Sequence, residues 1–155
     1  MSTGDGMNRE PSQIIAILYR LIETCRDGQE GFLAAADRVP DGDLKALFNS
    51  YSRQRAQFLR ELQEEVRRRG GELETTGSLT GTLRREWMEM KGADAGDCEG
   101  AIMTECERGE DAAVKNYREA LAAELPGDLL ARVQQHYTQI RESHDLIRAL
   151  EKART

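Results

Sequence analysis

The 155-residue sequence contains little that would favour a β-sheet or interrupt a helix. It has 3 prolines, and only 5% of its residues are aromatic, whereas alanine, leucine, glutamate and arginine are abundant. Because these abundant residues are the stronger helix formers, the composition favours helices over strands. A chain of this length usually forms one domain, and it can bury enough surface to fold without disulfides or structural metals.

Positive charge is also scarce. The chain carries 22 lysines and arginines against 28 aspartates and glutamates, which gives a net charge of −6 at pH 7. Nucleic acids and anionic membranes are usually bound by a basic surface, so neither is expected as a partner. The one basic run, three arginines at residues 67–69, precedes Gly70 and Gly71. We interpret it as the last turn of a helix, where cations offset the negative end of the helix dipole.

The sequence also lacks a CxxC motif, a signal-peptide pattern at its start and any apolar run near the roughly 18 residues of a membrane span. We therefore expect a cytoplasmic protein with reduced thiols and no membrane partner. Cys25 and Cys106 are expected to fill the core, with a redox pair as the alternative. Cys98 lies near a predicted helix start, which favours a more reactive thiol there.

Apolar residues recur at three- and four-residue steps in four long segments, residues 14–36, 44–66, 102–125 and 129–150. This spacing predicts four amphipathic helices. Asp41 to Asp43 are predicted to cap the second helix, and Pro126 to Asp128 to separate the last two. A shorter helix is predicted between Ser78 and Gly92, with Trp87, Met88 and Met90 covering the bundle's side or supplying a dimer contact.

The connections predict how these helices are arranged. Short joins at residues 40–43 and 126–128 make two antiparallel hairpins, and residues 70–97 form a long crossover that carries the short extra helix. One long crossover is the ferritin-like arrangement, so we expect an all-α, ferritin-like four-helix bundle. Residues 1–9 are expected to be a flexible tail and residues 10–153 a single domain. The segment that begins at Cys25 resembles the segment that begins at Cys106, which favours a duplicated hairpin.

A ferritin-like di-iron centre needs a carboxylate from two helices and Glu-x-x-His from each of the other two. The second helix has Gln54 and Arg55 where this motif should stand, and in the fourth helix Arg141 lies three residues before His144. The remaining candidate ligands are Glu30, Glu110 and His144, which could hold a divalent ion such as iron, manganese or zinc. The sequence therefore does not encode a complete di-iron centre.

The same positions also fit a buried polar network. Its predicted members lie near the middle of the apolar stripes: Gln29, Gln54, Arg55, Glu110, Tyr137 and His144. Arg55 is expected to pair with Glu110, with Tyr137 or His144 completing the hydrogen bonds. His136 lies one position off the apolar face and is expected at the surface or at the boundary of the core. No catalytic triad or phosphate loop is present. Because the Glu-x-x-His motifs are incomplete as well, the sequence leans away from an enzyme.

Three segments carry a resemblance to a known family: residues 25–32 (CRDGQEGF), 51–58 (YSRQRAQF) and 105–111 (ECERGED). The chain resembles a bacterial family of ferritin-like four-helix-bundle proteins of unknown function. The resemblance implies the fold and an association with stress-responsive proteins. We therefore expect a non-catalytic stress-associated or binding protein, self-associating and most simply dimeric, with a buried polar layer in place of a di-iron site. The alternative is a metal-binding protein with ferroxidase-type activity.

Overall fold

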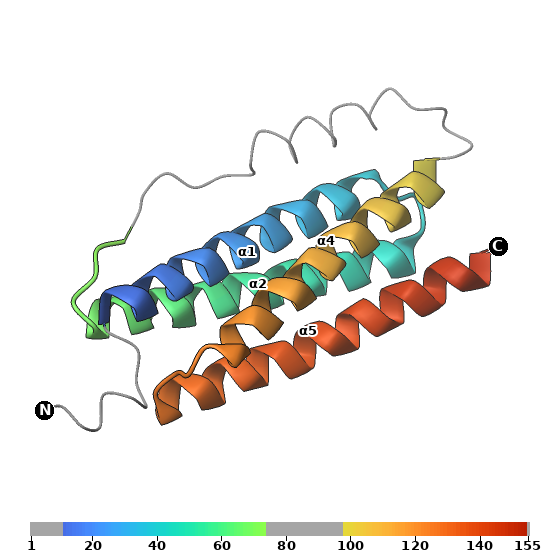
Figure 1. The fold of residues 1–155 in the computed structure, drawn as a ribbon. Helices are drawn as coiled ribbons and strands as arrows, with labels where there is room; N and C mark the ends of the chain where they lie inside the picture. The colour runs from blue at the N-terminus through green and yellow to red at the C-terminus, as the bar shows by residue number, and fades with distance from the viewer. Residues whose placement is uncertain (1–10, 74–97, 155) are drawn as a thin grey trace, which may run out of the picture.

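The computed structural model describes residues 11–73 and 98–154, and all regular structure in these two ranges is helical. The helices are α1 (Pro11–Arg38), α2 (Gly42–Arg68), α4 (Cys98–Ala122) and α5 (Gly127–Arg154). They pack as a four-helix bundle, which confirms the predicted all-α class (Figure 1). The predicted tail at residues 1–9 and the short helix between Ser78 and Gly92 lie outside the described residues.

The direction of the helices follows from their connections. The pairs α1–α2 and α4–α5 are antiparallel hairpins with short turns, whereas α2 and α4 run the same way (Figure 1). The end of α2 and the start of α4 therefore lie at opposite ends of the bundle, about the length of a helix apart, or roughly 40 Å. The pairs α1–α2, α4–α5 and α1–α4 form the main contacts, and α2 touches α5 only sparsely.

The helix ends show why the chain turns where it does. The Asp41 carboxylate accepts hydrogen bonds from the backbone N–H groups of Asp43 (2.7 Å) and Leu44 (3.0 Å), which caps α2 as predicted. At the other end, Gly70 adopts a positive φ of 81°, a conformation that favours glycine. Helix α4 ends at Ala122, three residues before the predicted Leu125. Leu125 itself precedes Pro126, a position at which helical backbone is disfavoured.

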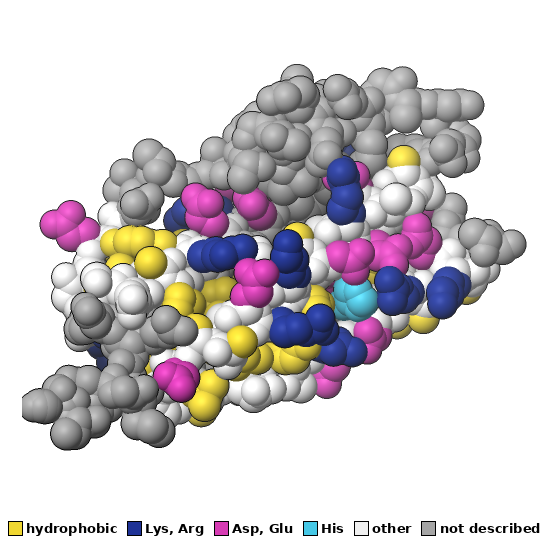
Figure 2. Space-filling model, in the orientation of Figure 1, with side chains coloured by type: hydrophobic (Ala, Val, Ile, Leu, Met, Phe, Trp, Pro, Cys, Tyr) yellow, Lys and Arg dark blue, Asp and Glu magenta, His cyan; other side chains and the backbone are white. Residues whose placement is uncertain are grey.

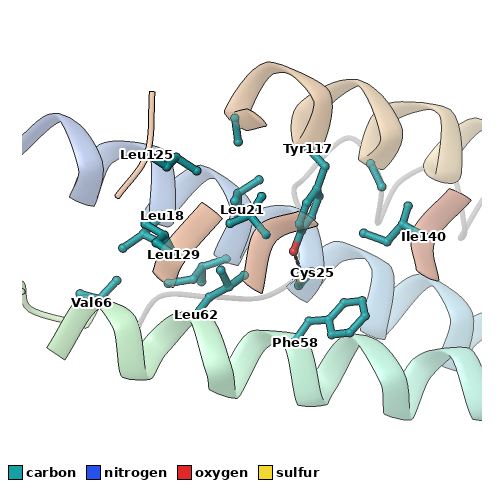
Figure 3. Packing of buried hydrophobic residues seen from close by; sticks show 14 of the residues in the cluster. Leu18, Leu21, Cys25, Phe58, Leu62, Val66, Tyr117, Leu125, Leu129 and Ile140 are labelled. Carbon is teal, nitrogen blue, oxygen red and sulfur yellow. Dashed lines mark hydrogen bonds between the residues drawn. The ribbon is translucent and has the colours of Figure 1, made fainter. Parts of the chain in front are cut away.

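The core of the described helices consists of two apolar clusters, one toward each end of the bundle. The larger cluster contains Leu18, Leu21, Leu62, Leu129 and Ile140 and includes Cys25 and Tyr117 (Figure 3). The smaller cluster contains Phe32, Phe48, Ile102, Cys106 and Ile147. In each helix a gap separates the residues of the two clusters, and the gaps lie at residues 26–31, 49–57, 107–112 and 141–146. Polar side chains occupy the centre of the bundle at this level.

The surface of the described helices carries charge of both signs. Acidic and basic side chains are interspersed over the face in Figure 2 and do not separate into areas of one sign. None of the described helices is long and apolar enough to cross a membrane.

Truncation of Leu62 shows how far the free energy of unfolding depends on the larger cluster. Its side chain is fully buried, so Leu62→Ala should lower the free energy of unfolding by about 3 kcal/mol through lost burial and the cavity left behind. The matched control is Leu33→Ala, because Leu33 is 49% exposed and its truncation should change stability by less than about 0.5 kcal/mol. Urea unfolding of both variants measures the difference, and equal losses would contradict this packing.

Candidate functional site

The centre of the bundle is a buried ion pair between α2 and α4. The Arg55 guanidinium donates to both carboxylate oxygens of Glu110, with Nη1–Oε1 at 2.7 Å and Nη2–Oε2 at 2.9 Å. Both side chains are about 1% exposed. Burial alone would lower the pKa of Arg55, but the Glu110 carboxylate more than compensates and raises that pKa above its ordinary value. The cation and the carboxylate therefore sit in fork-to-fork contact between the two apolar clusters.

Side chains from the other helices complete this central layer. Ser143 on α5 accepts from Arg55 Nη2 at 2.8 Å and donates to Glu110. Gln54 accepts from Arg55 Nε at 3.1 Å, and its amide donates to Gln139 on α5. On α1, the Phe32 ring lies 5.3 Å from the guanidinium carbon. Such a stack on an aromatic face favours the cation.

Gly28 on α1 makes room for this arginine. A Cβ atom built at Gly28 would lie 3.1 Å from Arg55 Nη1 and 3.2 Å from Arg55 Cγ. The glycine that occupies the equivalent place in the second half, Gly109, has open space at its own Cβ position. The internal similarity of the sequence therefore does not give the two glycines the same role, because only one faces the guanidinium.

The structure brings together three of the six residues predicted for the buried network, Gln54, Arg55 and Glu110. Ser143, which the sequence reasoning missed, takes the place proposed for Tyr137 or His144. Tyr137 instead accepts hydrogen bonds from Arg118 and Arg141 at the bundle's outer side. Gln29 contributes its backbone carbonyl, which accepts from the Ser52 hydroxyl at 2.8 Å.

His144 belongs to a separate group on the α4–α5 side. Its Nε2 lies 2.6 Å from Asp111 Oδ1, and its Nδ1 lies 3.0 Å from Asp145 Oδ1. Burial lowers the pKa of His144, but the hydrogen bonds to Asp145 and Asp111 outweigh it, so the pKa lies above its ordinary value. Glu30, the third candidate metal ligand, is half-buried on α1. Among residues 11–73 and 98–154, no three His, Cys, Asp or Glu side chains gather as a metal site would need.

A second buried polar chain was missed because His136 was expected at the surface or at the boundary of the core. That prediction is wrong, since His136 is 1% exposed and its ring stacks on Phe58 with centroids 3.9 Å apart. Its Nδ1 lies 3.0 Å from the Tyr117 hydroxyl, and its Nε2 lies 2.7 Å from Glu61 Oε1. Cys25 Sγ lies 3.2 Å from the same hydroxyl. We call Cys25, Tyr117, His136 and Glu61 the Tyr117 chain.

Burial dominates the titration of the Tyr117 chain. It raises the pKa of the Cys25 thiol to about 11 and raises the pKa of Tyr117 well above its ordinary value. It also lowers the pKa of His136, although the Glu61 carboxylate partly opposes this effect. All three groups are therefore neutral at physiological pH. Glu61 is half-buried and also pairs with Arg132 at 3.1 Å.

Cys25 and Cys106 are both buried free thiols. Cys25 belongs to the larger apolar cluster and Cys106 to the smaller one, as expected for core-filling residues. Burial raises the pKa of both thiols, which opposes formation of the reactive thiolate. The Cys98 side chain lies outside the described part of the structure.

An open polar groove of about 360 Å³ lies between α2 and α5, beside the Tyr117 chain. Four glutamines line it, two from each helix, together with Glu61 and His136: Gln54, Gln57, Gln135 and Gln139. Amide groups can both donate and accept hydrogen bonds, so the groove suits a neutral polar ligand or a polar protein surface.

The fold and the central layer define a four-helix bundle with an ion pair at its centre. A family model described as a domain of unknown function (DUF2383) matches residues 13–123, more than half of the chain, and the protein belongs to this family. The matched region includes Arg55 and Glu110 and ends before α5. No curated protein matches the sequence.

Removal of Arg55 should lower the stability of the fold, because it leaves the buried Glu110 carboxylate without its partner. We expect Arg55→Met to lower the free energy of unfolding by about 3–5 kcal/mol. Replacing both partners, in Arg55→Met with Glu110→Leu, should restore a large part of that loss, because two apolar side chains leave no uncompensated charge. Arg53→Met, at an exposed position of α2, is the control. Urea unfolding measures all three, and an Arg55→Met variant as stable as the control would refute this account of the layer.

The two histidines should respond to pH in opposite directions. The ordinary histidine pKa is 6.5, and folding lowers the pKa of His136 but raises that of His144. The unfolded chain thus binds more protons at residue 136, so the stability that His136 contributes is lost as pH falls below about 6.5. The stability that His144 contributes is present below about 6.5 and is lost as pH rises through its raised folded pKa.

Unfolding midpoints of His136→Gln and His144→Gln between about pH 5 and 8 measure these contributions. The wild-type advantage over His136→Gln should shrink toward the acid end, and its advantage over His144→Gln toward the alkaline end. The same pH trend in both variants would contradict the assignment.

Proposed function

We propose that this protein is a non-catalytic, stress-associated or binding member of the ferritin-like class, with a buried polar layer in place of a di-iron centre. The parallel direction of α2 and α4, with the long connection it requires, supports the ferritin-like assignment (Figure 1). The association with stress-responsive proteins rests on the sequence resemblance alone. A cytoplasmic location remains part of the same proposal.

The observation that carries this proposal is the position of Arg55. In a ferritin-like centre the inward carboxylates share metal ions. Here both oxygens of Glu110 are engaged by a permanent cation, which would repel a divalent ion placed beside it. His144 also directs its Nε2 at Asp111, and not at Glu110. The residues present therefore do not fit the di-iron group.

The groove between α2 and α5 supports a role in binding. It joins the central layer through Gln54 and the Tyr117 chain through His136, so a ligand there would contact groups held by the buried network. Self-association, most simply as a dimer, is a further part of the proposal. Light scattering of the full chain at several concentrations tests it, and a monomeric mass throughout would contradict it.

Metal loading tests the absence of a di-iron centre. The full chain is loaded with Fe²⁺, Mn²⁺ or Zn²⁺, desalted and measured by elemental mass spectrometry. We expect far less than one ion per chain, since metal binding at Glu110 would require Arg55 to leave a buried ion pair.

The comparison uses Glu110→Gln and His144→Gln, which remove one candidate ligand each with little change in size. Near-stoichiometric metal in the wild type that is lost in both variants would overturn the proposal. That result would favour the alternative, a metal-binding protein that uses Glu30, Glu110 and His144 and has ferroxidase-type activity.

A further inference from the structure

The Tyr117 chain lies outside the central layer, and the proposed function does not account for it. Tyr117 is fully buried in the larger apolar cluster, and its hydroxyl points at Cys25 (Figure 3). A buried phenol needs one hydrogen-bond partner, yet this oxygen has two, Cys25 Sγ at 3.2 Å and His136 Nδ1 at 3.0 Å. The chain then continues through His136 to the half-buried Glu61 carboxylate. It therefore connects the middle of the core to the groove.

The protons along this chain have one consistent arrangement. A carboxylate only accepts, so Glu61 must accept a hydrogen bond from Nε2–H of His136. In a neutral imidazole the other nitrogen then has no proton, so Nδ1 accepts from the Tyr117 hydroxyl. That leaves the Cys25 S–H to donate to the phenol oxygen. The hydrogen bonds thus run in one direction, from the thiol to the carboxylate.

We propose that Tyr117 is a one-electron redox site whose phenolic proton is accepted by His136. A diffusible radical oxidant, such as one formed from a peroxide, removes one electron from the phenol and is itself reduced. The O–H bond of Tyr117 breaks, and the proton forms an N–H bond at His136 Nδ1. The products are a neutral tyrosyl radical and an imidazolium that still donates through Nε2 to Glu61. Return of one electron sends the proton back.

The surroundings of Tyr117 make this coupling necessary. A cationic phenol radical would place an unpaired charge among Leu21, Ile140 and other apolar side chains, which is unfavourable in a medium of low polarity. Transfer of the proton across the 3.0 Å hydrogen bond moves the charge to an imidazole that faces a carboxylate. The distance lies within the range in which a side chain acts as a general base. The electron itself can tunnel, so the ring needs no exposure.

The charges around His136 come from several helices. Glu61 and Arg55 lie on α2, Arg132 lies on α5, and the neutral partners Tyr117 and Cys25 lie on α4 and α1. Glu61 favours the imidazolium, whereas Arg132 and Arg55 oppose it. The oxidation is therefore expected to slow at acid pH, where His136 is already protonated and can accept no proton.

The test uses flash-photolysed tris(bipyridine)ruthenium as a one-electron oxidant of the full chain, with freeze-quench electron paramagnetic resonance and transient absorption as readouts. We expect a hydrogen-bonded neutral tyrosyl radical that is absent in Tyr117→Phe. Tyr137→Phe is the matched control. The Tyr137 hydroxyl accepts hydrogen bonds from two arginines, which cannot take up its proton, so it should not supply this signal. Oxidation of Tyr117 should slow in deuterated water and by about 10²-fold in His136→Gln, the lower end of what a positioned base contributes.

Glu61→Gln keeps the proposal testable if a core variant fails to fold. This half-buried substitution removes the carboxylate that stabilises the imidazolium, so formation of the radical should again slow. The proposal is overturned if the signal persists in Tyr117→Phe or disappears in Tyr137→Phe. It is also overturned if His136→Gln and Glu61→Gln fold but leave the rate and its solvent isotope effect unchanged.

Discussion

The guanidinium of Arg55 is the group through which the described helices meet. It donates to both carboxylate oxygens of Glu110 on α4, to Ser143 on α5 and to Gln54 on α2, and it lies over the Phe32 ring of α1. A buried charge is tolerated only when its hydrogen-bonding capacity is met, and each of these partners comes from a fixed place on its helix. A shift of α4 or α5 along its axis would leave a buried polar group without its partner, and a shift of α1 would move Phe32 away from the guanidinium.

This requirement explains how two apolar clusters can coexist in one bundle. Apolar contacts alone are not directional and tolerate sliding by a turn, since leucine, valine and isoleucine can substitute for one another as neighbours. The central ion pair lies between the two clusters and fixes the register of the helices, so each apolar side chain packs in only one cluster. The sparse contact between α2 and α5 is bridged by polar pairs, among them Gln54–Gln139, Glu61–Arg132 and Glu61–His136. The groove between the two helices is therefore lined by members of these polar pairs.

The differences between prediction and structure concentrate in α5. Its most deeply buried residues, each at most 1% exposed, are Leu129, Val133, His136, Ile140, Ser143 and Ile147, with steps of four and three in alternation. His144, at 8% exposed, lies beside this stripe. The sequence analysis counted four residues onward from Val133 and from Ile140, and so selected Tyr137 and His144. In the structure the step is three at both places, so His136 and Ser143 face the centre. Both choices are compatible with an amphipathic helix, because residues three and four positions apart lie on the same side. A strict heptad reading would have found both residues.

By itself the sequence determined the all-helical class, the four long helices, the cap at Asp41 and the glycine end at Gly70. These features depend on neighbouring residues and on local backbone preferences, which a linear pattern contains. It also indicated that Arg55 and Glu110 lie on apolar stripes and that the di-iron motif is incomplete. Only the tertiary structure decided that Gly28 faces Arg55 and that Ser143 completes the ion pair. It alone placed the Tyr117 hydroxyl between Cys25 and His136, because such contacts depend on the rotation of each helix against three others.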